Sequence, residues 1–382
     1  MLIGVGGMSR WLQDRRAHRV VVVADPAVCD TAVARELRAA ITWAGATVDV
    51  VATPADTAMP GVEVVADHLA GRDVVVSLGG GATLDVVKVA VAMSADPRVR
   101  RHFDAAGRSG VIFLRDTTTP VIRHVAVPTT IGTGSERGPR ACLVLGGRKR
   151  LLFGTALQPD LAVLDPVATA TLPAHLVLEG VMENVVRQSG AFIGDVSPDG
   201  QRIEDELVLT VIRRAIAVGD RLCAGAADGA MTADDRLEAA KLSAWAQSAE
   251  FTSPSRDPFA NKGWYLSNEL STMFSARKIA AFAAVIPPWW RRVADGDRRW
   301  GSAQRLARLW AEIGSVRAVD ADPVQGFRAL VDDWGITTMP PISGDDASRA
   351  ARQCLDAWGR GLPALGTLDH SDIEGVMADL RR

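Results

Sequence analysis

The sequence lacks cysteine clusters, long apolar runs and any excess of positive charge. Its four cysteines are scattered, without CxxC or zinc-type spacing, which is typical of reduced thiols in a cytoplasmic protein. No stretch approaches the roughly 18 consecutive apolar residues of a membrane span, and the N-terminus has no apolar segment of signal-peptide length. The formal net charge of −2 argues against a broad cationic surface for nucleic acid. We therefore expect a cytoplasmic protein that binds neither membrane nor nucleic acid.

The 382 residues are enough for two domains. Up to about residue 170, β-rich runs alternate with helical patterns; the runs are 19–25, 47–52, 73–81, 111–115, 121–128 and 161–165. Apolar strands that alternate with helices are typical of a parallel sheet covered on both faces. The sequence thus predicts a Rossmann-like α/β nucleotide-binding domain at residues 1–172. Beyond it, helical spacing of apolar residues predicts an all-helical substrate domain at residues 173–382.

Two polar loops follow predicted strands. In "VSLGGGATLDVVKVA" (76–90), three glycines stand where a buried strand passes into a helix, so backbone N–H groups can approach a pyrophosphate. A tight turn without ligand explains the glycines equally well. The second loop, "VPTTIGTGSE" (127–136), is rich in hydroxyl groups and glycine and also follows a strand. Two such loops at the carboxyl ends of parallel strands indicate a dinucleotide site.

These motifs, followed by "QPDLAVLDP" (158–166), resemble those of the iron-containing (group III) alcohol dehydrogenases of the dehydroquinate synthase-like superfamily. The first motif of that family is usually GGGSxxDxxK, so Ala82 replaces a serine here. The resemblance implies a dehydroquinate synthase-like fold and an NAD-dependent oxidoreductase. It also implies a homodimer, because relatives commonly dimerise through the N-terminal domain.

The resemblance assigns cofactor roles to individual residues. It places Gly79, Gly80 and Gly81 at the pyrophosphate, with Asp85 in the same motif, and Thr129, Thr130 and Thr133 near the nicotinamide and its ribose.

Two further residues belong to the expected cofactor site. Asp25 matches the family acid that hydrogen-bonds the adenosine ribose, and its charge favours NAD over NADP because it repels a 2′-phosphate. The alternative for Asp25 is a turn residue before Pro26. Lys149 falls near the position of a ribose-contacting lysine in relatives.

The metal ligands of the family are replaced in this chain. Relatives bind a divalent metal through an Asp and a His four residues apart and through two later histidines. The first pair aligns with Glu183 and Arg187 in "EGVMENVVRQ" (179–188). The later pair aligns with Trp264 and Lys278 in "GWYLSNELSTMFSARKIAAF" (263–282). Trp, Arg and Lys are not metal ligands at neutral pH, so we predict no metal.

No histidine is available to take over the lost role, because none lies between His175 and His370. Asn268 occupies another histidine position of the family and, with Trp264, is expected to contact substrate.

The replacements keep the summed charge of the site. One acidic ligand, neutral imidazoles and a divalent metal sum to +1, as do Glu183, Arg187 and Lys278. In one interpretation the cations replace the metal: Lys278 holds an alkoxide or accepts its proton, and Arg187 clamps a carboxylate. In the other, Glu183 simply pairs with Arg187 or Lys278 to satisfy a buried cavity.

A cationic pocket suits an anionic substrate, whether a small molecule or the C-terminus of a peptide. Oxidation of a β-hydroxy acid gives a β-keto acid, which decarboxylates readily without a metal. Metal-less relatives of this superfamily occur in the biosynthesis of ribosomal peptide natural products (RiPPs), and analogy with them suggests a peptide substrate. In daptide-type pathways such a homologue oxidatively decarboxylates a C-terminal threonine.

Two other functions remain open from the sequence. One is a catalytically degenerate NAD-binding or scaffold subunit that partners another enzyme of a biosynthetic complex. The other is a lyase akin to dehydroquinate synthase, which fits less well because the Glu-x-x-Lys spacing of those enzymes differs from that of Glu183 and Arg187.

Overall fold

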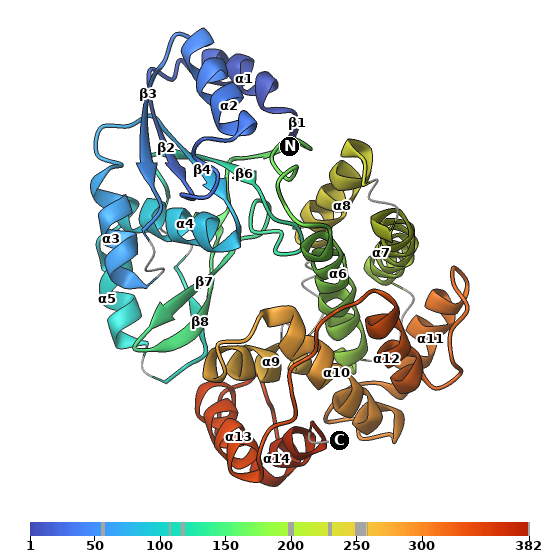
Figure 1. Ribbon diagram of the computed structural model, residues 1–382. Helices are drawn as coiled ribbons and strands as arrows, with labels where there is room; N and C mark the ends of the chain where they lie inside the picture. Colours follow the sequence, from blue (N-terminus) through green and yellow to red (C-terminus); the bar gives the residue numbers. More distant parts are fainter. Residues whose placement is uncertain are drawn as a thin grey trace. The chain divides into compact units, whose positions relative to one another are not determined.

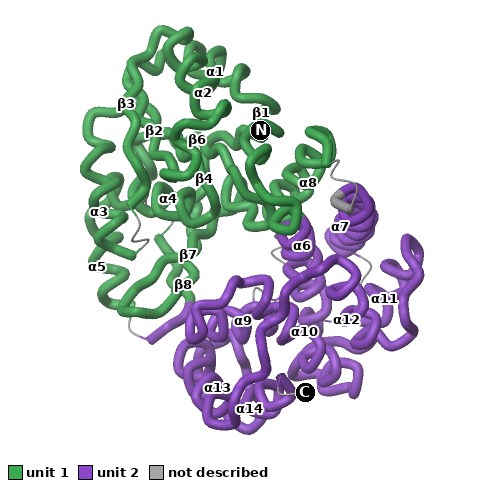
Figure 2. The backbone as a smooth tube through the Cα atoms, in the orientation of Figure 1, with its two compact units in different colours: residues 1–107, 111–177, 231–249 green, residues 108–110, 178–230, 250–382 purple. Residues whose placement is uncertain are grey.

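The computed structural model divides into two compact units, coloured separately in Figure 2. Unit 1 comprises residues 1–107, 111–177 and 231–249, and unit 2 comprises residues 108–110, 178–230 and 250–382. The structure describes residues 1–54, 58–106, 108–115, 119–197, 202–227, 231–248, 257 and 259–380. None of the helices in these ranges is both long and apolar enough to cross a membrane.

Unit 1 is built on a six-stranded sheet in the order β1-β9-β6-β4-β2-β3. Every strand pair in this sheet is parallel, which confirms the predicted α/β fold class. The central strands are apolar and buried on both faces, as expected where helices cover both sides of a parallel sheet. The strands are β1 (Leu2–Ile3), β2 (Arg19–Ala24), β3 (Thr47–Ala52), β4 (Val74–Gly79), β6 (Arg123–Pro128) and β9 (Leu161–Leu164).

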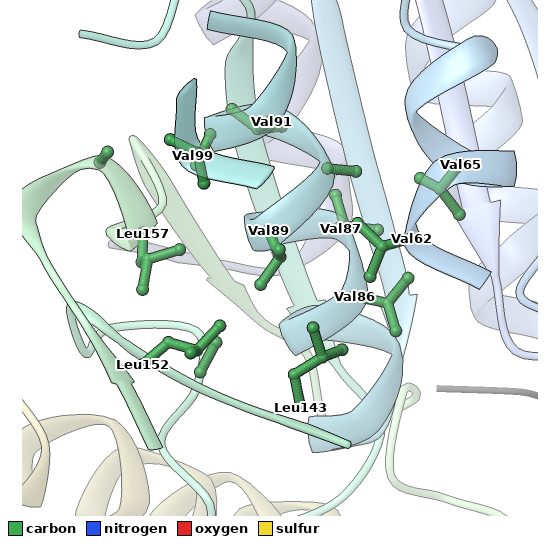
Figure 3. Packing of buried hydrophobic residues seen from close by; sticks show 14 of the residues in the cluster. Val62, Val65, Val86, Val87, Val89, Val91, Val99, Leu143, Leu152 and Leu157 are labelled. Carbon is green, nitrogen blue, oxygen red and sulfur yellow. The ribbon is translucent and has the colours of Figure 1, made fainter. Parts of the chain in front are cut away.

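Helices cover the two faces of this sheet (Figure 1). On one face, α1 (Met8–Asp14) and α2 (Ala32–Trp43) share a core with alternate residues of β2, such as Val20 and Val22. The intervening residues of β2 point to the opposite core, where α3 (Met59–Asp67), α4 (Gly81–Ala95) and α5 (Arg98–Ala105) pack. Figure 3 shows this second core, in which valines of α3 and α4 meet leucines of a smaller sheet.

The smaller sheet contains β5 (Val111–Phe113), β7 (Arg140–Leu145) and β8 (Arg148–Phe153) in the order β5-β8-β7. The sequence prediction that residues 111–115 belong to the main sheet is wrong, because β5 pairs with β8 instead. Strands β7 and β8 were not predicted. They form an antiparallel hairpin whose two linking residues, Gly146 and Gly147, both have positive φ. Such a Gly-Gly pair suits a two-residue hairpin turn, and it was the overlooked signal.

The chain passes between the two compact units more than once, so no single boundary in the sequence separates them. The predicted boundary lies between residues 172 and 173, whereas the units divide after Val177, inside helix α6 (Ala174–Gly194). Helix α8 (Ala233–Ala246) comes late in the chain but belongs to unit 1. There, Arg236 donates hydrogen bonds to the carbonyl oxygens of Thr169 and Leu172.

The regular elements among the described residues of unit 2 are all helices, as predicted for this half of the chain. Besides most of α6, it contains α7 (Ile203–Ala227), α9 (Lys262–Met273), α10 (Lys278–Ala294), α11 (Ala303–Gly314), α12 (Pro323–Asp333), α13 (Gly344–Trp358) and α14 (His370–Asp379). Helices α9 and α10 pack closely at Gly263. A Cβ at that position would lie 2.5 Å from the Trp289 ring, so the glycine makes room for the tryptophan.

A buried ion pair joins α7 to α11. Arg305 Nη2 lies 2.6 Å from Asp205 Oδ1, and both side chains are almost completely buried. The same guanidinium donates from Nε to the carbonyl oxygen of Phe192 at 2.7 Å and lies over the Phe192 ring. Such a pair matters most when one partner is removed, since the other is left as a buried, uncompensated charge.

We expect Arg305→Met to lower the free energy of unfolding by about 3 kcal/mol or more, because Asp205 loses its partner in the interior. Arg308, on the same helix, pairs with Glu206 at the surface and supplies the control. Arg308→Ala should cost less than about 1 kcal/mol. Urea denaturation measures the free energy of unfolding of both variants. Equal decreases in the two variants would contradict the greater importance of the buried pair.

Candidate functional site

The predicted cofactor residues gather at the carboxyl ends of three neighbouring strands. Asp25 follows β2, Gly80 follows β4 and Thr129 follows β6, and these strands lie side by side in the sheet. The chain leaves β2 into α2 on one face and leaves β4 into α4 on the other. The point where successive helices change face is where parallel α/β sheets bind ligands. The topology therefore predicts a ligand site between Asp25 and the glycine turn.

The glycine turn touches the second loop directly. A Cβ on Gly80 would lie 3.2 Å from Thr130 Cγ2, and one on Gly81 would lie 2.8 Å from Thr133 Cγ2. The backbone N–H of Thr129 also donates to the carbonyl oxygen of Gly79 at 2.9 Å. These contacts confirm that the two polar loops form one surface. Any larger residue at Gly81 would push them apart.

The turn also has the backbone arrangement of an anion cradle. Gly80 is the N-cap of α4 and has no side chain to occupy the first N–H groups of the helix. These amides, together with the helix dipole, favour a phosphate at this end of α4. The residues present therefore fit the pyrophosphate of a dinucleotide, and the cofactor assignment of Gly79, Gly80 and Gly81 stays a prediction with a geometric basis.

Asp25 has a structural role that is visible in the fold. Its Oδ1 accepts a hydrogen bond from the backbone N–H of Ala27 at 2.9 Å, which stabilises the turn after β2. Its own N–H donates to Leu78 of the neighbouring strand. Both interpretations of Asp25, turn residue and ribose acceptor, are compatible with this position.

Both carboxylate oxygens of Asp85 accept hydrogen bonds from the second loop and the segment that follows it. Its Oδ1 accepts from the Ser135 hydroxyl at 2.5 Å, and its Oδ2 accepts from the backbone N–H of Cys142 at 2.8 Å. Burial raises the pKa of Asp85, and the charges of Lys88 and Lys149 oppose that shift. Asp85 thus anchors the segment that follows the second loop. Lys149, on β8, contributes to the charge around it.

Lys88 is a buried cation that the sequence analysis did not assign. Its Nζ donates to the carbonyl oxygens of Gly138 at 2.9 Å and Arg140 at 2.8 Å, and its side chain is 1% exposed. Desolvation lowers the pKa of Lys88 to about 8, against the opposing charges of Asp85 and Glu136. Desolvation also raises the pKa of the buried Glu136 to about 7. Both residues lie within the quoted motifs, which was the available signal.

In unit 2, Glu183 and Arg187 form an ion pair on one face of α6. Arg187 Nε lies 2.8 Å from Glu183 Oε1, and a second guanidinium nitrogen contacts the same oxygen. The predicted i, i+4 relationship is confirmed. Two neighbours frame the pair: Glu179 binds Arg277 at 2.9 Å, and the Asn261 amide donates to the Arg187 carbonyl at 3.2 Å.

The other two replaced positions also contact each other. Lys278, the first residue of α10, places its Nζ 3.8 Å from the centre of the Trp264 ring. Trp264 in turn makes edge-to-face contacts with Tyr265 and Trp358. Asn268, one helical turn after Trp264, is completely buried. An ammonium group over an indole face is a cation–π interaction, which stabilises the charged form of the lysine.

These residues do not fit a metal. The guanidinium of Arg187 and the ammonium of Lys278 offer hydrogen-bond donors and positive charge where a metal needs lone pairs. Within the described ranges, no three His, Cys, Asp or Glu side chains are grouped so that they could hold an ion. The absence of a metal remains a prediction that rests on the chemistry of these donors.

Comparison with known proteins gives this arrangement a family context. Residues 2–166 match the family model described as iron-containing alcohol dehydrogenase. Phosphonoacetaldehyde reductase of Streptomyces viridochromogenes is 35% identical over 179 residues, 44% of this chain and 43% of that protein. 4-Hydroxybutyrate dehydrogenase of Cupriavidus necator is 35% identical over 126 residues, 32% of each chain. The chain thus spans less than half the length of these curated relatives.

Solved structures extend the likeness of fold to the whole chain. NADH-dependent butanol dehydrogenase A of Thermotoga maritima superposes with a TM-score of 0.81 over 100% of this chain and 96% of its own, at 15% identity. The chain is related to the iron-containing alcohol dehydrogenases. The family model covers residues 2–166, and Arg187, Trp264 and Lys278 stand beyond it, where the resemblance places metal ligands.

The buried Glu136 predicts a measurable pH dependence of stability. Because its folded pKa of about 7 lies above its ordinary value of 4.5, the folded state holds the proton more tightly. This contribution is complete below pH 4.5 and is lost as pH rises through about 7. The Gln side chain of Glu136→Gln cannot ionise, so the variant lacks this loss. The free energy of unfolding of the variant minus that of the parent protein should therefore increase from pH 5 to pH 7.5, by up to about 3 kcal/mol.

Urea denaturation at the two pH values checks this difference. The matched control is Glu36→Gln on the exposed surface of α2, whose effect should be the same at both pH values. A Glu136→Gln effect that does not change with pH would show that the carboxyl is not buried as a proton-binding group.

Proposed function

We propose that the protein is an NAD-dependent, metal-independent oxidoreductase that oxidises a hydroxyl group of an anionic substrate. The observation that carries this proposal is the contact of Gly80 and Gly81 with Thr130 and Thr133 at the strand ends. The proposal assigns cofactor binding to unit 1 and recognition of substrate charge to unit 2. The acid at Asp25 supports NAD over NADP.

The charges of unit 2 support an anionic substrate. Two ion pairs, Glu183 with Arg187 and Glu179 with Arg277, are each neutral, and Lys278 brings the sum of these five residues to +1. Two of the similar enzymes are named for substrates with an acidic group, phosphonoacetaldehyde and 4-hydroxybutyrate.

Lys278 and Arg187 differ in the role that their contacts favour. The Trp264 face favours a charged Lys278, so we assign it to hold a substrate carboxylate or developing alkoxide rather than to accept a proton. Arg187 already bonds Glu183 through two nitrogens, so its part is to fix the orientation of Glu183. Glu183 is then the candidate acceptor of the hydroxyl proton.

NAD, when bound, accepts the hydride from the carbon that bears the hydroxyl group. A β-hydroxy acid would leave this step as a β-keto acid, which loses CO₂ readily. The substrate we favour, by analogy with daptide-type RiPP enzymes, is a peptide with C-terminal threonine, whose carboxylate and hydroxyl suit the cationic pocket. We further propose that the protein acts as a homodimer in the cytoplasm.

A second candidate is an NAD-binding or scaffold subunit without catalytic activity. The observation that favours it is that the charged groups of unit 2 already have partners inside the protein, Glu183 with Arg187 and Lys278 with Trp264. The two candidates differ in turnover, not in cofactor binding.

Substitution of Lys278 separates these candidates. We expect Lys278→Met to lower kcat/KM for an anionic substrate about 100-fold or more, because a charge that stabilises the reacting anion is lost. Lys278→Arg should keep part of the activity, and NADH binding should be unchanged in both. The measurement is NADH formation followed by absorbance, with nucleotide affinity from fluorescence titration. NADH binding without turnover on any hydroxy acid would favour the scaffold.

The metal and substrate assignments need a separate assay. Incubation of chelator-treated protein with NAD⁺ and peptides ending in Thr should yield NADH and a mass loss equal to CO₂ plus two hydrogen atoms. Peptides ending in Ala serve as the control because they carry no hydroxyl. Activity that disappears with chelator and returns with Fe²⁺ or Zn²⁺ would overturn the metal-independent mechanism. Activity on small hydroxy acids alone would contradict the proposal that the substrate is a peptide.

A further inference from the structure

Helix α8 contacts the second cofactor loop. The hydroxyl oxygen of Ser243 accepts a hydrogen bond from the backbone N–H of Gly132 at 2.9 Å, in a buried position. One turn later, Gln247 Oε1 accepts from Arg140 Nη1 at 2.9 Å. Ser243 and Gln247 are both buried, whereas Lys241 and Trp245 face outward on the same helix.

Gly134 shows how closely this helix and the loop fit. Its φ of +58° is a left-handed conformation, and a Cβ there would lie 2.2 Å from Gln247 Cγ and 2.9 Å from the Ser243 carbonyl oxygen. The glycine is needed both for its backbone angle and for the space that Gln247 fills. The two residues of α8 therefore set the path of the loop between Gly132 and Gly134.

Helix α8 is itself firmly attached to unit 1. A capping box between Thr232 and Asp235 fixes its first turn. Arg236 then binds two backbone carbonyls of the segment after β9. The loop is consequently held between two anchored helices: α4, through Asp85 and Lys88, and α8, through Ser243 and Gln247.

We propose that Ser243 and Gln247 are positioning residues for the nicotinamide half of the cofactor. They act through the loop that carries Thr129, Thr130 and Thr133. This inference rests on the proposed NAD site. Asp25, assigned to the adenosine ribose, makes its hydrogen bonds to Ala27 and Leu78 instead. Ser243 and Gln247 should therefore affect the binding of NADH and not that of AMP, which carries the adenosine and lacks the nicotinamide and its ribose.

The test compares dissociation constants for NADH and AMP in four variants of the full chain. Ser243→Ala leaves the buried Gly132 N–H without its acceptor, and Gln247→Ala removes the acceptor for Arg140 and the packing against Gly134. Each should raise the Kd for NADH about five- to tenfold, with the Kd for AMP within about twofold of that of the parent protein. Gln247→Glu keeps an acceptor oxygen and the size of the side chain, so it should retain NADH affinity.

Lys241→Ala, on the outward face of α8, is the matched control and should change neither constant. Thermal midpoints without nucleotide identify any variant that fails to fold, in which case Gln247→Ala against Gln247→Glu carries the comparison. If the parent protein binds NADH and the Ala variants bind it equally well, the positioning role is wrong. Equal weakening of NADH and AMP binding also overturns it. Failure of the parent protein to bind NADH would instead overturn the proposed function and this inference together.

Discussion

The contact between the glycine turn and the threonine loop is the constraint on which the proposed cofactor site depends. Gly80 and Gly81 lie so close to Thr130 and Thr133 that a side chain at Gly81 would separate the two loops. Without Cβ atoms, the first N–H groups of α4 stay open to a phosphate while hydroxyl groups of the second loop stand beside them. The absence of Cβ atoms at Gly80 and Gly81 therefore leaves room both for a phosphate at the first N–H groups of α4 and for the threonine hydroxyl groups beside it.

Buried charges hold the segment that follows the loop. Lys88 and Asp85 pay a desolvation penalty, visible in the lowered pKa of the lysine and the raised pKa of the aspartate. In return, four directed hydrogen bonds fix the chain between Ser135 and Cys142. Directed bonds in a dry interior define a geometry more sharply than apolar contacts of similar strength. Such definition is what a site for a long, multi-part cofactor requires.

In unit 2, replacing a metal by cations changes the available chemistry. A divalent metal accepts lone pairs and can bind a neutral hydroxyl group, whereas ammonium and guanidinium groups only donate hydrogen bonds and attract anions. In the proposed function, a site that contains Lys278 is therefore suited to a substrate that already carries negative charge. The contact of Lys278 with the Trp264 ring helps to hold that charge in place.

The sequence by itself determined the α/β class and the helical second half, and it supplied the predictions of two cofactor motifs and of residues in place of metal ligands. These features are local: strand periodicity, glycines at a strand end, and the i, i+4 spacing of Glu183 and Arg187. Only the tertiary structure decided that residues 111–113 pair with β8, that Lys278 lies on Trp264, and that α8 returns to unit 1 to hold the loop at Gly132. Strand pairing and side-chain contacts between separate elements depend on how the elements pack, and no short pattern in the chain records them.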